Sequence, residues 1–211
     1  MKNKLILFDW GNIVESHKTG FTCYDGWNEL FKRCGYKGNE NIYSIFKNYK
    51  EYCLEKIKTV EEFEKLFNLV SKDYNFNVDF KEFIKLFKET FSKVDYYKDV
   101  VDFEHSLKDK CYIGILSNLN IFEKERLDKQ VDLSKYDYVF LSFEIGLVKP
   151  DIEIYKYIQE KVNIDKKNIL FIDDKEINVN KALEFGWNAY KLTGLELDKI
   201  KEVCENFLGG K

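Results

Sequence analysis

The chain has 211 residues, 45% of them hydrophobic, with 37 acidic and 34 basic side chains and a net charge of −3 at pH 7. This supports a packed core with room for a smaller insertion, and the scattered lysines form no basic stripe of the kind that a nucleic-acid partner requires. No apolar run reaches the roughly 20 residues of a transmembrane helix, and five cysteines without a Cys-x-x-Cys pair are typical of a reducing, cytoplasmic setting.

The first predicted element is a buried strand at Leu5–Phe8, a short apolar run that stops at Asp9. A continuous run of this kind suits a parallel strand that is covered on both faces. The run is also shorter than the roughly 7–15 apolar residues of a signal peptide, so we expect no targeting segment here.

Residues 16–93 show helical periodicity and no convincing strand, which predicts four helices. Thr59 with Glu62 forms a capping-box pattern, and Asp79 with Glu82 repeats that start signal. The apolar stripes are Trp27, Leu30, Phe31 and Cys34; Ile42, Ile45, Phe46, Tyr49 and Cys53; Phe63, Leu66, Phe67 and Val70; and Phe83, Ile84, Phe87 and Phe91. Such stripes indicate the interior of a bundle rather than a ligand site. We therefore predict a core of residues 1–15 and 94–211 and a helical cap of residues 16–93.

The rest of the chain alternates between strand and helix patterns. Further strands are predicted at Tyr112–Leu116, Tyr138–Leu141 and Ile169–Ile172, and helices at Asp151–Val162, Asn178–Phe185 and Glu196–Leu208. This order predicts an α/β fold, in which helices cover both faces of a parallel sheet.

Polar residues follow the predicted strands, where parallel α/β sheets bind their ligands. They are Asp9, Ser117, Asn118, Lys149, Asp173 and Asp174. Three clustered carboxylates repel one another unless a cation neutralises them, and oxygen ligands without histidine or cysteine favour Mg²⁺. The lysine would balance a second anion such as a phosphoryl group, and a hydroxyl at a strand end suits phosphate oxygens.

With these motifs in order, the sequence resembles the haloacid dehalogenase superfamily over essentially its whole length. The matching positions are Asp9 for the first motif, Ser117 for the second, Lys149 in Gly-Leu-Val-Lys-Pro for the third and Asp173-Asp174 for the fourth. The helical insertion resembles the small C1-type cap of that superfamily. The resemblance implies a Rossmannoid parallel-sheet core with an inserted four-helix cap, a Mg²⁺ cofactor and an aspartyl-phosphate intermediate.

The resemblance also implies a role for each matching residue. The implied catalytic residues are Asp9, which would attack phosphorus, and Lys149. The implied metal ligands are Asp9, the carbonyl of Gly11, Asp174 directly and Asp173 nearby or through water. The implied phosphate-binding residues are Ser117, Asn118 and Lys149. Asn178 is expected to orient the acidic loop rather than to bind a ligand.

One position departs from the usual pattern of the superfamily. Most of its phosphatases have Asp-x-Asp in the first motif, and the second aspartate protonates the leaving oxygen, whereas this chain has Gly11 there. General acid–base catalysis typically contributes about 10²–10⁴ in rate. The form Asp-Trp-Gly-Asn-Ile-Val resembles the branch that includes bacterial glucose-1-phosphate phosphatase. We expect a nearby residue, Glu15 or His17, to replace the missing acid.

The sequence leaves three functions open. The first is a Mg²⁺-dependent phosphomonoesterase of a small phosphorylated metabolite such as a sugar phosphate. The second is a non-catalytic phosphate- or metal-binding regulatory protein, which Gly11 alone supports. The third is a 2-haloacid dehalogenase, which needs no metal and is disfavoured by Asp173-Asp174. We expect a monomer or homodimer with neither a nucleic-acid nor a membrane partner.

Overall fold

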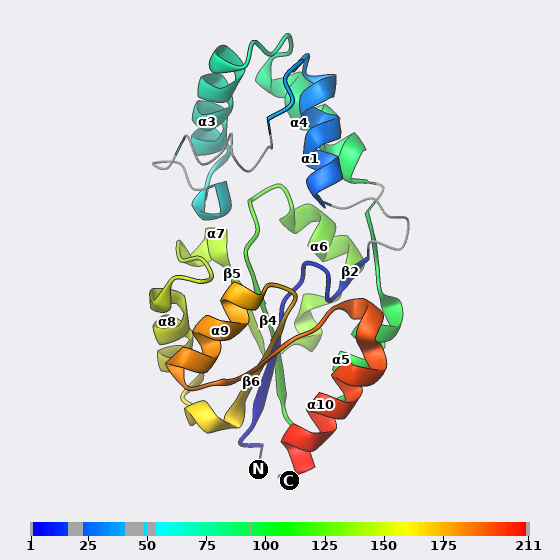
Figure 1. Cartoon of the computed structure of the whole chain (residues 1–211), viewed down its shortest axis with the longest axis vertical. Helices are drawn as coiled ribbons and strands as arrows, with labels where there is room; N and C mark the ends of the chain where they lie inside the picture. Colours follow the sequence, from blue (N-terminus) through cyan, green and yellow to red (C-terminus); the bar gives the residue numbers. More distant parts are fainter. Residues whose placement is uncertain (1, 17–22, 41–48, 50–53, 93, 210–211) are drawn as a thin grey trace.

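The computed structural model of the chain describes residues 2–16, 23–40, 49, 54–92 and 94–209. Two parts lie one above the other in Figure 1: a parallel sheet with its helices below, and a smaller group of helices above. Both chain ends lie at the bottom of the lower part, opposite the upper helices. The carboxyl ends of the strands therefore face the helical part.

The sheet has five parallel strands in the order β5-β4-β1-β6-β7. They are β1 (Leu5–Phe8), β4 (Tyr112–Ser117), β5 (Tyr138–Leu141), β6 (Ile169–Asp173) and β7 (Asn188–Lys191). The four predicted strands are confirmed. The edge strand β7 was not predicted, because only Ala189 in it is buried and the strand has no apolar run.

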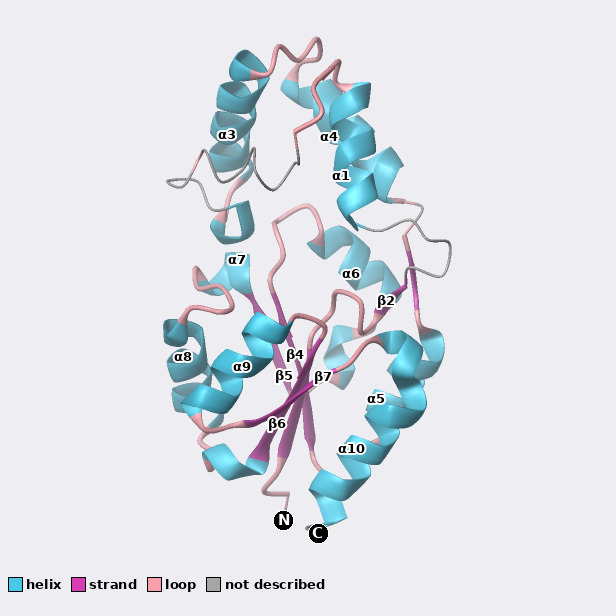
Figure 2. Ribbon diagram, in the orientation of Figure 1, coloured by secondary structure: helices cyan, strands magenta, loops and turns pink. Residues whose placement is uncertain are grey.

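Helices cover both faces of the sheet (Figure 2). One face packs against α5 (Lys98–Ser106), α6 (Lys124–Gln130) and α10 (Leu197–Gly209), and the other against α8 (Ile152–Val162) and α9 (Glu176–Phe185). The short elements are α7 (Ser142–Ile145), η2 (Leu133–Lys135), η3 (Lys166–Asn168) and η4 (Gly194–Glu196). The three predicted helices are confirmed to within two residues, whereas α5 and α6 were not predicted. Within the described ranges, no helix has the length and hydrophobicity needed to cross a membrane.

Strand β1 lies at the centre of the sheet, and all four of its side chains are fully buried. Ile6 and Phe8 pack with α5 and α10, while Leu5 and Leu7 pack with α8 and α9. This alternation is the period of two that a strand imposes. The strand therefore delivers the next residue, Asp9, to the edge of the sheet that faces the helical part.

The helical part contains α1 (Cys23–Arg33), η1 (Leu54–Lys56), α3 (Val60–Asp73) and α4 (Phe80–Phe91). The predicted capping box is confirmed at the start of α3, where Glu62 N donates to Thr59 Oγ1 at 3.1 Å and Thr59 N donates to Glu62 Oε2 at 3.2 Å. At the start of α4, Asp79 Oδ1 accepts a hydrogen bond from Glu82 N at 2.8 Å. The predicted apolar stripes of α1, α3 and α4 form one apolar cluster. The stripe over 42–53 lies outside the described residues, except for Tyr49.

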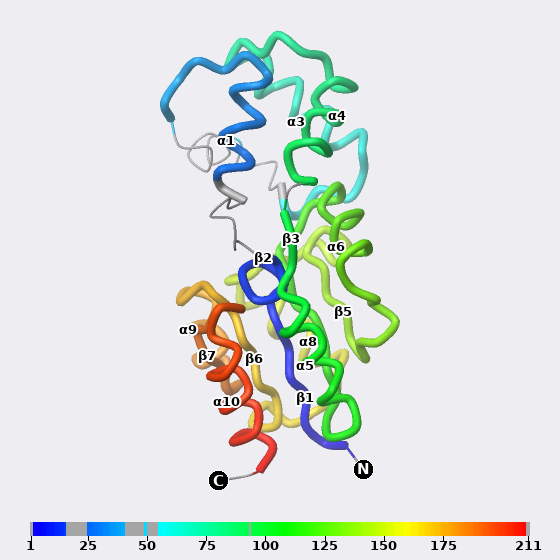
Figure 3. Tube along the Cα trace, turned by 90° about the vertical axis from the view of Figure 1, so that its right-hand side faces the viewer, coloured from blue at the N-terminus to red at the C-terminus, as the bar shows by residue number. Residues whose placement is uncertain are grey.

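The chain crosses between the two parts through β2 (Glu15–Ser16) and β3 (Asp95–Tyr96), which pair antiparallel (Figure 3). Glu15 is buried, and its Oε1 lies 2.6 Å from Nη2 of Arg126 on α6. The guanidinium of Arg126 also lies over the ring of Phe91, the last residue of α4, with its Cζ 5.3 Å from the ring centroid. Arg126 therefore connects the sheet domain, the crossing ribbon and the helical part.

A buried acid on α5 makes the stability of the protein depend on pH. The side chain of Glu104 is fully buried, and its Oε2 accepts a hydrogen bond from Tyr136 Oη at 2.5 Å. Burial raises the pKa of Glu104 to about 8, although the hydrogen bond from Tyr136 lowers it. The pKa of Glu104 is higher in the folded protein than in the unfolded chain. Its contribution to the free energy of unfolding is therefore full below about pH 4.5. It is lost as pH rises through about 8.

We therefore expect Glu104→Gln, which keeps an acceptor for Tyr136 and cannot ionise, to stabilise the protein at alkaline pH. Its Tm should exceed that of the wild type by roughly 5 °C or more at pH 8.5, and the difference should vanish near pH 5. Circular dichroism melts from pH 5 to 9 measure this. Glu160→Gln, an exposed glutamate on α8, is the matched control. A difference that does not change with pH would contradict the assignment.

Candidate active site

Three aspartates meet at the carboxyl ends of β1 and β6. These strands are neighbours, and Asp9 N donates to Ile172 O at 2.8 Å, so Asp9 directly follows β1 beside Asp173 at the end of β6. Each of Asp9, Asp173 and Asp174 offers one carboxylate oxygen, and these oxygens all lie within 4.8 Å of one another. The sequence-predicted acidic cluster is therefore present as a geometric unit.

Lys149 lies inside this cluster and is 4% exposed. Its Nζ is 3.0 Å from Asp9 Oδ1 and 2.6 Å from Asp173 Oδ2, and it also donates to Leu116 O at 2.9 Å. Burial lowers the pKa of Lys149, but the charges of Asp173 and Asp9 outweigh burial and the pKa is raised overall. The lysine is therefore charged, and it neutralises one of the three carboxylates.

Asp9 is fixed by donors that converge on one oxygen. Its Oδ1 accepts hydrogen bonds from Trp10 N at 2.7 Å and from Ser117 Oγ at 2.9 Å, in addition to the contact with Lys149. Its Oδ2 accepts no hydrogen bond from the described residues. Burial raises the pKa of Asp9 to about 6; Lys149 opposes the rise, and the charges of Asp173 and Asp174 add to it. The carboxylate is held in one orientation while its second oxygen is left available.

Asp173 and Asp174 have different surroundings. Asp173 is fully buried and accepts hydrogen bonds from Lys175 N at 2.8 Å and from Asn178 Nδ2 at 3.0 Å. Asn178 therefore orients the acidic loop, as predicted. Asp174 is half-buried, and its Oδ2 accepts a hydrogen bond from Asn12 Nδ2 at 2.7 Å. Asp174 is thus the more accessible carboxylate.

Asn118 connects two of the predicted motifs. Its Nδ2 donates to Lys149 O at 2.9 Å, and its Oδ1 accepts from Lys149 N at 2.9 Å. Both polar atoms of the side chain are therefore used to hold the backbone of Lys149. The amide of Asn118 positions the lysine, and the backbone N–H groups of this loop are the better candidates for phosphate contact.

Gly11 lies beside the nucleophile candidate and has space around it. A Cβ built on Gly11 would meet only Asp9 Oδ2, at 3.9 Å, which is an ordinary van der Waals contact. The backbone of Gly11 is not in the left-handed region. Packing and backbone conformation therefore both permit a Cβ atom where the usual motif has its second aspartate.

Glu15 or His17 was expected to replace that aspartate. Glu15 is buried in the crossing ribbon, where its carboxylate is held in an ion pair with Arg126. His17 lies outside the described residues. Sequence reasoning missed Asn12, although its place directly after Asp9-Trp10-Gly11 at a strand end is a signal that could have identified it.

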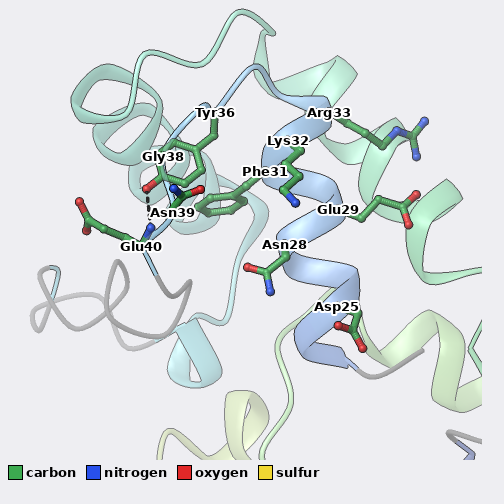
Figure 4. Close-up of a pocket in the computed structure, with 10 residues that line it drawn as sticks. All are labelled: Asp25, Asn28, Glu29, Phe31, Lys32, Arg33, Tyr36, Gly38, Asn39 and Glu40. Atoms are coloured by element: carbon green, nitrogen blue, oxygen red, sulfur yellow. Dashed lines mark hydrogen bonds between the residues drawn. The ribbon is translucent and has the colours of Figure 1, made fainter. Parts of the chain in front are cut away.

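A cavity of about 720 Å³ lies elsewhere, on the helical part (Figure 4). Asp25, Asn28 and Lys32 on α1 line one side of it, and Tyr36 with residues 38–40 lines another. Side chains of both charges surround it, and none of the strand-end residues does. The convergent charges at the strand ends therefore identify the candidate active site better than cavity volume does.

A parallel sheet with an acidic cluster and a buried lysine at its strand ends, beneath a helical insertion, is the Rossmannoid arrangement that the motifs indicate. The chain belongs to the haloacid dehalogenase-like hydrolase family, whose model matches residues 11–190. The predicted family and the predicted parallel-sheet fold class are therefore confirmed, and the chain belongs to a family of hydrolases.

Two curated proteins share parts of the sequence. D-ribitol-5-phosphate phosphatase of Bacteroides thetaiotaomicron is 27% identical over 108 residues, which are 48% of this chain and 52% of that protein. Drimenol cyclase of Aspergillus calidoustus is 30% identical over 83 residues, which are 39% of this chain and 15% of that protein. The matched regions thus span about half of these relatives or less.

Solved structures match over almost the full chain. A haloacid dehalogenase family enzyme of Bacteroides thetaiotaomicron, in complex with magnesium and inorganic phosphate, has a TM-score of 0.70 and 25% identity. The match covers 92% of this chain and 96% of that one. A 2-haloacid dehalogenase of Pseudomonas syringae has a TM-score of 0.59 and 15% identity, with 90% and 85% covered, and shares the fold.

Proposed function

We propose that this protein is a Mg²⁺-dependent phosphomonoesterase that hydrolyses small phosphorylated metabolites, with sugar or polyol phosphates as its substrate class. Asp9 would be the nucleophile and would carry an aspartyl phosphate. The observation that supports this most directly is the cluster of Asp9, Asp173, Asp174 and Lys149 at the strand ends.

The charge of the cluster supports a divalent cation. Three carboxylates against one ammonium leave two negative charges, and the described ligand atoms are oxygens, which Mg²⁺ prefers. Asp9, Asp174 and the carbonyl of Gly11 would hold the ion, with Asp173 nearby. When bound, Mg²⁺ would neutralise phosphoryl oxygens and so favour attack on phosphorus.

The chain's own residues would position both reactants. Trp10 N and Ser117 Oγ donate to Asp9 Oδ1 and so would fix the orientation of the carboxylate for attack on phosphorus. Lys149 would place its ammonium beside the phosphoryl group, because the amide of Asn118 fixes its backbone. Such pre-positioned charges stabilise the transition state without reorganisation when the reaction occurs.

Similarity to known proteins supports the substrate class. The related structure holds magnesium together with inorganic phosphate, and the curated relative from the same organism is a D-ribitol-5-phosphate phosphatase. We also propose the division into a core of residues 1–15 and 94–211 and a cap of residues 16–93. Separate apolar clusters in the two parts and the β2–β3 ribbon between them support that division.

The function is tested by measuring phosphate release from a panel of sugar and polyol phosphates and from p-nitrophenyl phosphate. We expect turnover that needs Mg²⁺ and falls about 100-fold or more when a chelator removes the metal. Halide release from 2-haloacids without metal would instead support a dehalogenase. Binding of Mg²⁺ and phosphate without any turnover would support the non-catalytic protein.

A further inference from the structure

Gly11 has no carboxyl group where most phosphatases of the family have the aspartate that protonates the leaving oxygen. The structure offers a different carboxyl group for this role. Glu55 lies on η1, a short turn of the helical part that packs against α7. In Figure 1, η1 is the short cyan turn directly above α7. Nothing in the sequence motifs singles out Glu55.

The backbone of η1 is fastened to the loops that carry the site. Ser142 Oγ, at the start of α7, donates to Glu55 O at 2.6 Å and accepts from Leu119 N at 3.0 Å. Leu119 is two residues after Ser117. On the other side, Lys56 Nζ lies 3.4 Å from Oδ2 of Asp151, which is two residues after Lys149. The segment around Glu55 is therefore fixed to both the Ser117 loop and the Lys149 loop.

The carboxyl group of Glu55 interacts electrostatically with charged residues of the site. It is half-buried, and the charges of Lys175, Lys149 and Lys56 act on it, as its own charge acts on Glu123. Burial raises the pKa of Glu55, and these lysines lower it less than burial raises it. Its carboxylate has no hydrogen-bond or ion-pair partner among the residues that the structure describes. A half-buried acid that retains its proton more readily and has no partner is suited to proton transfer.

We propose that Glu55 is the general acid–base residue of this site and supplies from the cap the carboxyl group that Gly11 lacks. The inference rests on the proposed phosphomonoesterase function. In the first step the bond between phosphorus and the leaving oxygen breaks as the bond to Asp9 forms, and the proton of Glu55 passes to the leaving oxygen to give an alcohol. In the second step the Glu55 carboxylate takes a proton from water. The resulting hydroxide forms a bond to phosphorus, the Asp9–phosphorus bond breaks, and phosphate is released.

Glu55→Gln tests this with two leaving groups. A sugar or polyol phosphate releases an alkoxide that needs a proton, whereas p-nitrophenolate leaves without one. For the best alkyl phosphate, we expect kcat to fall by about 10²–10⁴-fold with little change in KM. With p-nitrophenyl phosphate, the first-turnover burst should keep the wild-type rate while the steady state slows. Glu61→Gln, an exposed glutamate at the start of α3, is the matched control and should behave as the wild type.

A second variant separates proton transfer from positioning. Gly11→Asp in the Glu55→Gln background should restore at least about tenfold of the lost alkyl phosphate turnover, because it returns a carboxyl group to a position where an added Cβ meets only Asp9 Oδ2, at 3.9 Å. Unchanged alkyl turnover in Glu55→Gln would overturn the proposal. So would an equal loss of the burst without rescue by Gly11→Asp. If the wild type shows no Mg²⁺-dependent turnover of any phosphate, the proposed function fails and the role of Glu55 fails with it.

Discussion

Asp9→Asn is expected to lower kcat for every phosphomonoester by about 10⁴–10⁶-fold, which is the usual scale for loss of a nucleophile. An amide does not attack phosphorus, and it contributes no negative charge to a cation. Asparagine keeps an oxygen that accepts from Trp10 N and Ser117 Oγ, so the local geometry survives. The loss should therefore appear in turnover and not in folding.

Stopped assays with the purified variant measure this loss, and thermal melts with and without Mg²⁺ provide the control. Without the metal, Asp9→Asn should melt no lower than the wild type, because burial already disfavours the charge of Asp9. The rise in Tm that Mg²⁺ causes should be smaller in the variant. Turnover within about tenfold of the wild type would remove Asp9 from the mechanism.

The second large effect is expected from Lys149→Met, which removes the ammonium between Asp9 and Asp173. Removing one partner of a buried ion pair destabilises by about 3 kcal/mol or more, or roughly 6–12 °C in Tm for a chain of this size. Turnover should fall by about 10²–10³-fold, since the phosphoryl group loses a fixed positive charge.

Magnesium distinguishes this effect from a simple packing defect. A divalent cation at the aspartates replaces part of the lost charge, so Mg²⁺ should raise the Tm of Lys149→Met by more than it raises that of the wild type. Lys156→Met, at an exposed lysine on α8, is the control and should match the wild type in both measurements. A Lys149→Met protein that is as stable as the wild type without Mg²⁺ would contradict the charge-balance argument.

The strands that are easiest to predict from the sequence are the most completely buried ones. Strands β1 and β6 are apolar at successive positions because helices cover both of their faces, so they stand out in the sequence. Strand β7 lies at the sheet edge, and its mixture of polar and apolar residues is not distinctive. Helices α5 and α6 are short and strongly charged, which hides their periodicity.

The residues of the site also differ in whether the sequence predicts their position. Asp9, Ser117, Lys149 and the Asp173-Asp174 pair follow strands, so topology alone predicts that they meet. Glu55 reaches the site only through tertiary packing of η1 on α7, and no local pattern marks that contact. The role of the Asn118 side chain also depended on the structure, because the hydrogen bonds to Lys149 join residues that are 31 positions apart.

The hydroxyl of Ser142 has one hydrogen and two acceptors within reach, Glu55 O at 2.6 Å and Leu119 O at 3.0 Å. If the cap lifts and takes η1 away, the hydrogen can turn to Leu119 O, and the serine is not left as a buried donor without a partner. Separation at this contact then costs about 1 kcal/mol, the net value of a typical hydrogen bond, instead of the larger penalty for an orphaned donor. The contact therefore breaks at low cost, as the proposed cap would require if it opened to admit a phosphorylated metabolite and to release the product.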